Sequence, residues 1–124
     1  MIVTDSSLLV AHLRGSKAAT RFLKGQKEVV APALVAWELW KGARTVAEHA
    51  AVRDLLGLCH VEPFSAALAE SAGLLYREAE GQGRRRPAID LLIASHALHR
   101  GCPVATLDHD YEGIPGLQVV KVKA

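Results

Sequence analysis

The chain has 124 residues, of which half are hydrophobic, and its 15 Lys and Arg against 13 Asp and Glu give a net charge of +2. This length and composition predict one compact domain spanning 1–124, without the charge excess that demands a nucleic-acid partner and without an apolar stretch long enough for a membrane span. We therefore expect no membrane association.

Cysteine use and the N-terminus indicate the cellular setting. Cys59 and Cys102 are the two cysteines, and they lack the C-x-x-C spacing of a redox or zinc motif. Such sparse cysteines favour a reducing compartment and pack as small hydrophobic residues. The opening Met-Ile-Val-Thr-Asp lacks the basic and apolar regions of a secretory signal. We expect a cytoplasmic protein.

The first half of the chain alternates predicted strands and helices. The expected elements are a strand at 2–4, a helix after Asp5 that ends at Gly15, a helix at 17–24, a strand at 28–31 closed by Pro32, a helix from Ala33, and a helix at 46–56. Apolar residues including Trp37 and Trp40 surround most of the helix from Ala33, which predicts deep burial.

The second half continues the same alternation. The expected elements are a short strand at 60–62, a long helix at 65–80, a basic loop at 81–86, a helix at 88–100 between Pro87 and Gly101, a strand at 104–106, a turn at 108–116 and a strand at 117–122. Repeated strand-helix-strand units with short apolar strands indicate an α/β fold, with a mostly parallel sheet covered by helices on both faces.

Four carboxylates occupy related positions in this pattern. Asp5 and Asp108 each follow a predicted strand, and functional sites in parallel sheets form at the carboxyl ends of the strands. Glu38 and Asp90 lie inside apolar helical segments. Carboxylates beside a core lose hydration and repel one another, so a cluster persists most easily when a divalent cation balances it. The pattern predicts a Mg²⁺- or Mn²⁺-dependent hydrolase.

Each acid also has a purely structural interpretation. The acids could favour helix N-termini (Asp5, Asp90), pair with a nearby lysine (Glu38 with Lys41) or occupy a turn (Asp108, Asp110). All of these interpretations would have to hold at once, which makes the structural explanation of the whole set the weaker one.

Four motifs together resemble a known family. They are Ile-Val-Thr-Asp5-Ser-Ser, Ala-Trp-Glu38-Leu, Pro-Ala-Ile-Asp90-Leu-Leu-Ile-Ala and Thr106-Leu-Asp108-His-Asp110-Tyr. Their order and spacing resemble PIN-domain ribonucleases of the VapC type, the toxins of VapBC toxin–antitoxin pairs. The resemblance implies a PIN-like three-layer α/β/α fold with a mostly parallel central sheet of four to five short strands.

The resemblance also implies the site and its partners. It makes Asp5, Glu38, Asp90 and Asp108 the catalytic and metal-binding acids, with Asp110 as an accessory metal ligand and with Ser6 and Thr106 as hydroxyl residues that contact the substrate near the metal. Which of Asp108 and Asp110 binds metal stays open, because the last motif often has Asn where this chain has Asp108. The implied cofactor is Mg²⁺ or Mn²⁺, the substrate is RNA, and the partner is a small cognate antitoxin.

Two surfaces are candidates for these partners. Arg84, Arg85 and Arg86 immediately precede the helix of Asp90 and could hold an RNA backbone, although a solvated charge run is an equal alternative. The Trp37 and Trp40 region, with the leucines of 55–58, could bind the antitoxin or form a homodimer.

Other function classes stay open at this point. A non-catalytic module of the same fold could use the acids to bind a basic partner segment or RNA. A receiver-like signalling domain expects a pair of acids after the first strand, and only Asp5 is present there. A phosphatase acting on small molecules is chemically compatible, and the basic loop weakly favours a polymer instead.

Overall fold

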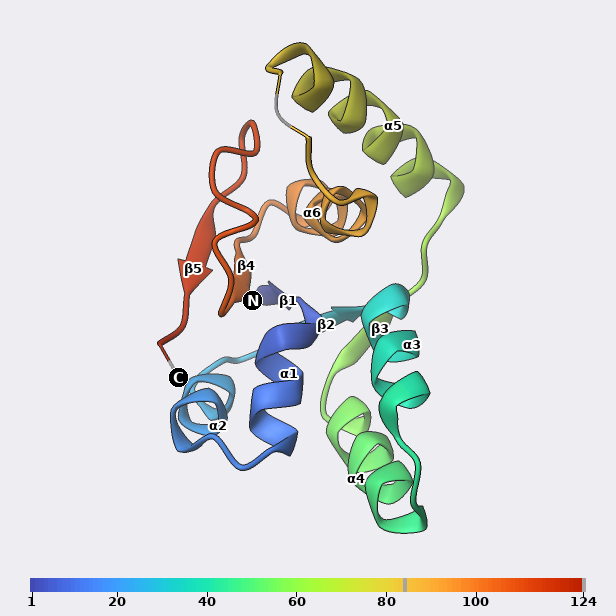
Figure 1. Cartoon of the computed structure of the whole chain (residues 1–124), viewed down its shortest axis with the longest axis vertical. Coiled ribbons are helices and arrows are strands. Elements are labelled where there is room, and N and C mark those ends of the chain that lie inside the picture. The colour runs from blue at the N-terminus through green and yellow to red at the C-terminus, as the bar shows by residue number, and fades with distance from the viewer. Residues whose placement is uncertain (84, 124) are drawn as a thin grey trace.

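The computed structural model describes residues 1–83 and 85–123, which contain a single parallel sheet (Figure 1). Its strands are β1 (Ile2–Thr4), β2 (Val29–Pro32), β3 (His60–Glu62), β4 (Val104–Thr106) and β5 (Val119–Lys121). They lie in the order β3-β2-β1-β4-β5, and every neighbouring pair is parallel. The predicted α/β class and parallel sheet are confirmed.

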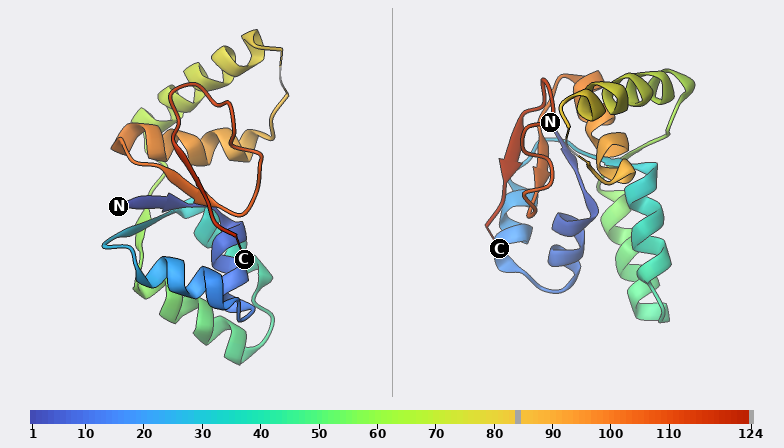
Figure 2. Two further views of the ribbon diagram at one scale, coloured as in Figure 1. Left: turned by 90° about the vertical axis from the view of Figure 1, so that its left-hand side faces the viewer. Right: turned by 45° about the horizontal axis from the view of Figure 1, so that its top comes forward.

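Six helices among the described residues cover this sheet. They are α1 (Ser6–Leu13), α2 (Lys17–Lys24), α3 (Ala33–Gly42), α4 (Val46–Gly57), α5 (Ala66–Gly81) and α6 (Ala88–Arg100). Figures 1 and 2 show α5 and α6 on one side of the sheet, with α1, α2 and α4 on the other, which confirms the three-layer prediction. Within the described residues, no helix has both the length and the apolar character that crossing a bilayer requires.

Local capping chemistry sets most helix ends. The side chains of Asp5, Ser16 and Ser65 each accept a hydrogen bond from a backbone N–H in the first turn of the helix that follows. Gly101 ends α6 with a φ of 66°, a left-handed conformation that glycine adopts without strain. The bounds of α2 and α6 are those that the sequence predicts, because these signals are local.

The core lies on both faces of the central strands. β1, β2 and β4 are fully buried, and the cysteines pack partly buried against the core, as predicted. The predicted deep burial of α3 is wrong at Trp37, which is 55% exposed. Its ring is covered instead by Lys41, whose Nζ lies 4.5 Å from the ring centroid, a cation–π contact at the surface.

An ion-pair cluster fastens the edge strand β3 to α6. Glu62, the last residue of β3, has Oε1 2.5 Å from His96 Nδ1 and accepts a hydrogen bond from Arg100 Nε at Oε2, also at 2.5 Å. The His96 side chain is fully buried. A buried polar group of this kind needs such partners, so the cluster fixes α6 relative to the sheet.

Candidate active site

The carboxyl ends of β1 and β4 form the floor of the site. These neighbouring strands pair Thr4 with Ala105, so the residues that follow them lie side by side. Thr106 Oγ1 donates a hydrogen bond to Asp5 Oδ2 at 2.5 Å, and the Asp108 N–H donates to the same Oγ1 at 2.9 Å. As predicted, Asp5, Thr106 and Asp108 lie together at one edge of the sheet.

Asp5 is both a helix cap and a buried acid. Its Oδ1 accepts hydrogen bonds from the Leu8 N–H at 3.3 Å and from Ser7 Oγ at 2.8 Å, while the residue is 3% exposed. Burial raises the pKa of Asp5 more than the hydrogen bonds from Thr106, Ser7 and Leu8 lower it. The capping role therefore does not exclude a functional one, since the same carboxylate faces the other acids.

Asp90 brings a further carboxylate from the first turn of α6. It is half-buried, and the hydroxyl of Tyr111 hydrogen-bonds its carboxylate. Within the described part of the chain, its Oδ2 is buried and has no hydrogen-bond partner. Burial first, and then the charges of Asp110 and Asp5, raise the pKa of Asp90 from 3.8 to about 6. A cation bound at this oxygen would relieve both effects.

Asp108 and Asp110 lie on the exposed turn that follows β4. Both charges contribute to the raised pKa of Asp90, so the structure brings these acids, Asp5 and Asp90 into electrostatic contact. The turn also provides Tyr111, which is 2% exposed and donates to Asp90. Burial, followed by the charges of Asp5, Asp90 and Asp108, raises the pKa of this phenol, so its proton is retained and it acts as a donor.

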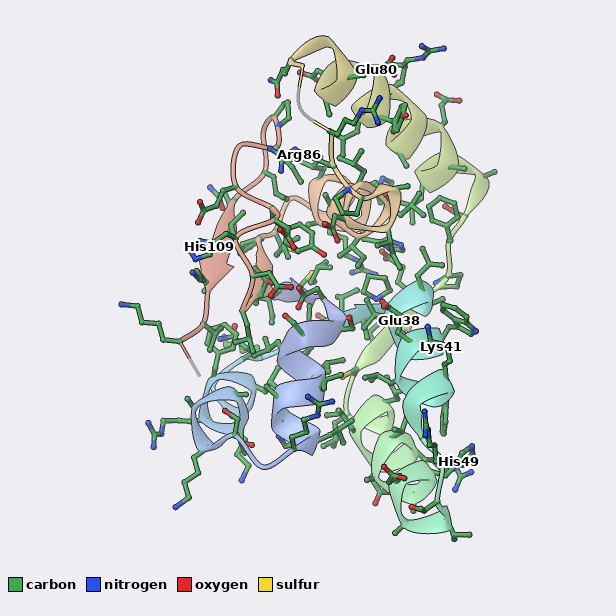
Figure 3. The ribbon with its side chains drawn as sticks, in the orientation of Figure 1. Glu38, Lys41, His49, Glu80, Arg86 and His109 are labelled. Atoms are coloured by element: carbon green, nitrogen blue, oxygen red, sulfur yellow. The ribbon has the colours of Figure 1, made fainter. Side chains whose placement is uncertain are left out.

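Glu38 comes from another element, α3. It is half-buried and lines a groove of about 240 Å³ with Arg14, which directly follows α1, and with Val52 of α4. Figure 3 shows Glu38 nearer the middle of the molecule than Lys41. Across residues 1–83 and 85–123, no three His, Cys, Asp or Glu side chains form a closed metal-binding cluster. The acids fit a hard cation by donor type, but they do not form a ready-made cage.

Ser7 and Tyr111 also contribute to this edge, and the sequence did not predict either of them. Ser7, rather than Ser6, contacts Asp5, and Ser7 Oγ also accepts the Leu107 N–H at 3.2 Å. Ser6 is half-buried at the start of α1, and its predicted contact with substrate stays a prediction. Tyr111 was the other omission, although its place directly after Asp110 was a usable signal.

The basic loop before α6 divides into residues of different kinds. Arg84 lies outside the described residues. Arg85 is exposed and, with Tyr76 and Glu80 of α5, lines a cavity of about 500 Å³. Arg86 points at the turn after β4 and donates hydrogen bonds to its backbone carbonyls. The predicted RNA contacts of this loop are not tested by these positions.

The fold and site define the class of protein, which is a parallel α/β protein with buried and exposed carboxylates at the carboxyl edge of its sheet. Residues 2–117 match the PIN domain family. Ribonuclease VapC10 of Mycobacterium tuberculosis is 34% identical to the chain over 111 residues, which is 87% of this chain and 83% of VapC10. The chain belongs to the PIN-domain family and is of the VapC type.

Solved structures agree with this fold. The VapBC2 complex of Rickettsia felis, bound to a DNA fragment from its promoter, contains a chain that matches with a TM-score of 0.87 at 23% identity, over 99% of this chain and 100% of that one. VapC20 of Mycobacterium tuberculosis, a toxin that cleaves the sarcin-ricin loop, matches with a TM-score of 0.73 at 21% identity, over 98% and 99%. At these identities the likeness supports the fold alone.

Proposed function

We propose that the chain is a Mg²⁺- or Mn²⁺-dependent endoribonuclease and the toxin of a type II toxin–antitoxin pair. The observation that carries the proposal is the buried, unpartnered Oδ2 of Asp90 among the charges of Asp5, Asp108 and Asp110. The likeness to ribonuclease VapC10 supports the reaction class. Several carboxylates close together at one sheet edge repel one another when no cation balances their charge. Their presence there supports metal-dependent chemistry.

The metal would be held chiefly by Asp5 and Asp90. Asp108, Asp110 and Glu38 would act through water or hold a second ion, and the choice between Asp108 and Asp110 stays open. When bound, the cation would supply positive charge to the phosphodiester and acidify a water molecule. Glu38 and Asp108 would orient that water for attack on phosphorus, leaving a 5′-phosphate and a 3′-hydroxyl.

The chain's own side chains keep the two main acids in position. Thr106, Ser7 and the Leu8 N–H hold the Asp5 carboxylate from three directions. Tyr111 holds Asp90 as a protonated donor. Since every donor is fixed before substrate arrives, little reorganisation is needed during the reaction.

RNA would approach over the loop before α6. Arg84 and Arg85 would neutralise phosphates, and the exposed side of Arg85 supports that role. Ser6 and Thr106 would lie close to the scissile phosphate. If these arginines contact phosphates, the cleavage rate should fall as the salt concentration rises, and Arg85→Ala should make that fall less steep.

A small antitoxin would occupy the groove that Glu38 lines between α1, α3 and α4. Arg14 and Glu38 give this groove charges of both signs beside apolar walls. Complexes of the VapBC type occur among the similar solved structures, including DNA-bound VapBC of Salmonella typhimurium. Exposed Trp37, Val61 and Phe64 would serve a homodimer, which light scattering on the purified chain tests.

The deciding experiment is cleavage of structured RNA with Mg²⁺ or Mn²⁺, beside an EDTA control and the Asp90→Asn protein. Asp54→Asn, which removes an exposed acid of α4, is the matched control and should cleave as wild type does. Products that need both metal and Asp90 would support the ribonuclease. Equal behaviour of wild type and Asp90→Asn would favour a non-catalytic module that binds RNA or a basic partner segment.

A further inference from the structure

Arg86 connects the entry of α6 to the acidic turn. It stands directly before Pro87, and its Nη1 donates to the Asp110 carbonyl at 2.6 Å while Nη2 donates to the Glu112 carbonyl at 2.7 Å. Figure 3 shows Arg86 between the α5–α6 connection and the chain that leads to β5. Two donors of one planar guanidinium therefore hold the carbonyls on both sides of Tyr111.

A second link joins the same segments in the opposite direction. Tyr111 reaches back from the turn, and its hydroxyl hydrogen-bonds Asp90, four residues after Arg86. Tyr111 is buried, and so is Ile114 further along the turn, at 3% exposed. The buried side chains of Tyr111 and Ile114 thus hold the turn against the core, and Arg86 holds its backbone carbonyls.

The turn needs these links because it contains no regular element. Residues 107–118 connect β4 to β5 without a helix or strand, and their internal backbone bonds include Glu112 N–H to the His109 carbonyl at 3.2 Å and Leu117 N–H to the Ile114 carbonyl at 3.1 Å. A segment held by few backbone bonds depends on side-chain contacts for its position. Asp108 and Asp110 are carried on this segment.

We propose that Arg86 is a positioning residue for the acidic site: its guanidinium fixes residues 110–112 against the start of α6 and thereby sets the spacing between Asp90 and the acids of the turn. The inference rests on the proposed function, since the spacing matters when these acids share a cation. It gives Arg86 a role other than the phosphate contact that the sequence predicts. Groups that orient metal ligands have large effects on metal affinity without touching the metal.

The test compares three arginine variants of the full chain. Arg86→Lys keeps the charge but loses the planar pair of donors, so Mn²⁺ affinity of the RNA-free protein should weaken by roughly 10-fold or more, with a lower kcat and a nearly unchanged KM for RNA. Arg85→Ala should raise KM and leave Mn²⁺ affinity unchanged. Arg77→Ala, which removes a surface arginine bonded to Glu80 at 3.3 Å, is the matched control and should change neither.

Hydrogen–deuterium exchange of the metal-free protein provides a second measurement. Arg86→Lys should speed exchange across 109–114 and leave α4 unchanged, because the paired hydrogen bonds to the Asp110 and Glu112 carbonyls are lost. Tyr111→Phe removes the opposite link and should also weaken Mn²⁺ binding. If Arg86→Lys does not fold, Arg86→Gln, which keeps one amide donor, takes its place in both measurements.

Each outcome decides the proposal. A folded Arg86→Lys protein with wild-type Mn²⁺ affinity and wild-type exchange overturns it. A raised KM with intact Mn²⁺ affinity also overturns it, and assigns Arg86 to phosphate binding. If the wild type neither binds Mn²⁺ nor cleaves RNA, the proposed ribonuclease function fails instead, and the exchange of the turn still decides whether Arg86 fixes it.

Discussion

Thr106 Oγ1 donates a 2.5 Å hydrogen bond to Asp5 Oδ2, although the two residues are 101 positions apart in the sequence. Thr106 ends β4 and Asp5 follows β1, so the bond joins neighbouring parallel strands at their carboxyl ends. The same Oγ1 accepts the Asp108 N–H. One fully buried hydroxyl therefore fixes a carboxylate after one strand and the start of the acidic turn after the next.

Replacing this hydroxyl with a methyl group should reduce both stability and activity. Thr106→Val keeps the shape but removes the hydrogen bonds that the hydroxyl makes with Asp5 Oδ2 and with the Asp108 N–H, so the free energy of unfolding should fall by about 1–3 kcal/mol. Urea unfolding and RNA cleavage measure the two effects. Thr106→Ser keeps the hydroxyl and is the matched control. Equal stability and rates in the two variants would contradict the role given to Thr106.

Removing the Asp90 charge should stabilise the metal-free protein while abolishing cleavage. Burial and the charges of Asp110 and Asp5 make the ionised carboxylate unfavourable at pH 7.5 when no cation is present. Asp90→Asn should therefore raise Tm in EDTA, by about 3 °C or more if the gain approaches 1 kcal/mol. Mg²⁺ should raise the Tm of wild type and not of the variant. A lower Tm for Asp90→Asn in EDTA would contradict this account.

The fold was largely predictable because its signals are local. Ser16 begins α2, and Pro87 with Gly101 bounds α6, so these helices have the predicted residues. The last strand is shorter than the predicted 117–122, since the Leu117 N–H bonds the Ile114 carbonyl and closes a turn first. Trp37 was misjudged because apolar periodicity does not distinguish a core face from an exposed one.

The site was predictable where strand order decides it. Asp5 follows β1, Thr106 ends β4 and Asp108 comes just after it, and any parallel sheet brings the carboxyl ends of its strands to one edge. The contact of Arg86 with the turn after β4 was not predictable, because it depends on where that turn lies in space. The contact of Ser7 with Asp5 was not predictable either, because it depends on side-chain directions in the first turn of α1.

Metal affinity should fall as the pH drops below about 6. Burial, with the charges of Asp110 and Asp5, raises the pKa of Asp90 to about 6, so protons and cations compete for its carboxylate below that pH. Each further pH unit should weaken Mn²⁺ binding by up to about 10-fold. Calorimetric titration between pH 5 and 7.5 measures this. Asp110→Asn removes one of the charges that raise the pKa of Asp90, so it should move the onset of the steep dependence to lower pH, and an unchanged onset would assign the titration to another group.

The same shift predicts how the metal-free protein responds to pH. An acid whose pKa is raised binds its proton more tightly in the folded state, so the contribution of Asp90 to stability decreases as the pH rises from its ordinary pKa of 3.8 to about 6. Urea unfolding in EDTA should show a smaller decrease over this range for Asp90→Asn than for wild type. Parallel curves for the two proteins would contradict the burial of an ionisable Asp90.

Breaking the Glu62 cluster should destabilise the fold without involving the acidic site. Burial alone would raise the pKa of Glu62, but hydrogen bonds from His96 and Arg100 outweigh it and lower the pKa below 4.5. This carboxylate therefore stabilises the fold above pH 4.5, and the stabilisation is lost as the pH falls through the lowered value. Glu62→Gln should cost about 2 kcal/mol at pH 7, less than a fully buried pair because Arg100 is 22% exposed.

Urea unfolding at pH 7 and pH 3 distinguishes this cluster from a surface ion pair. Glu80→Gln, which breaks the exposed pair with Arg77, is the matched control and should change the free energy of unfolding by under about 0.5 kcal/mol at either pH. The cost of Glu62→Gln should be large at pH 7 and should shrink toward acidic pH, because the wild-type carboxylate loses its charge as the pH falls through its lowered pKa. Equal costs for the two variants at pH 7 would mean that β3 is held to α6 by apolar packing rather than by Glu62.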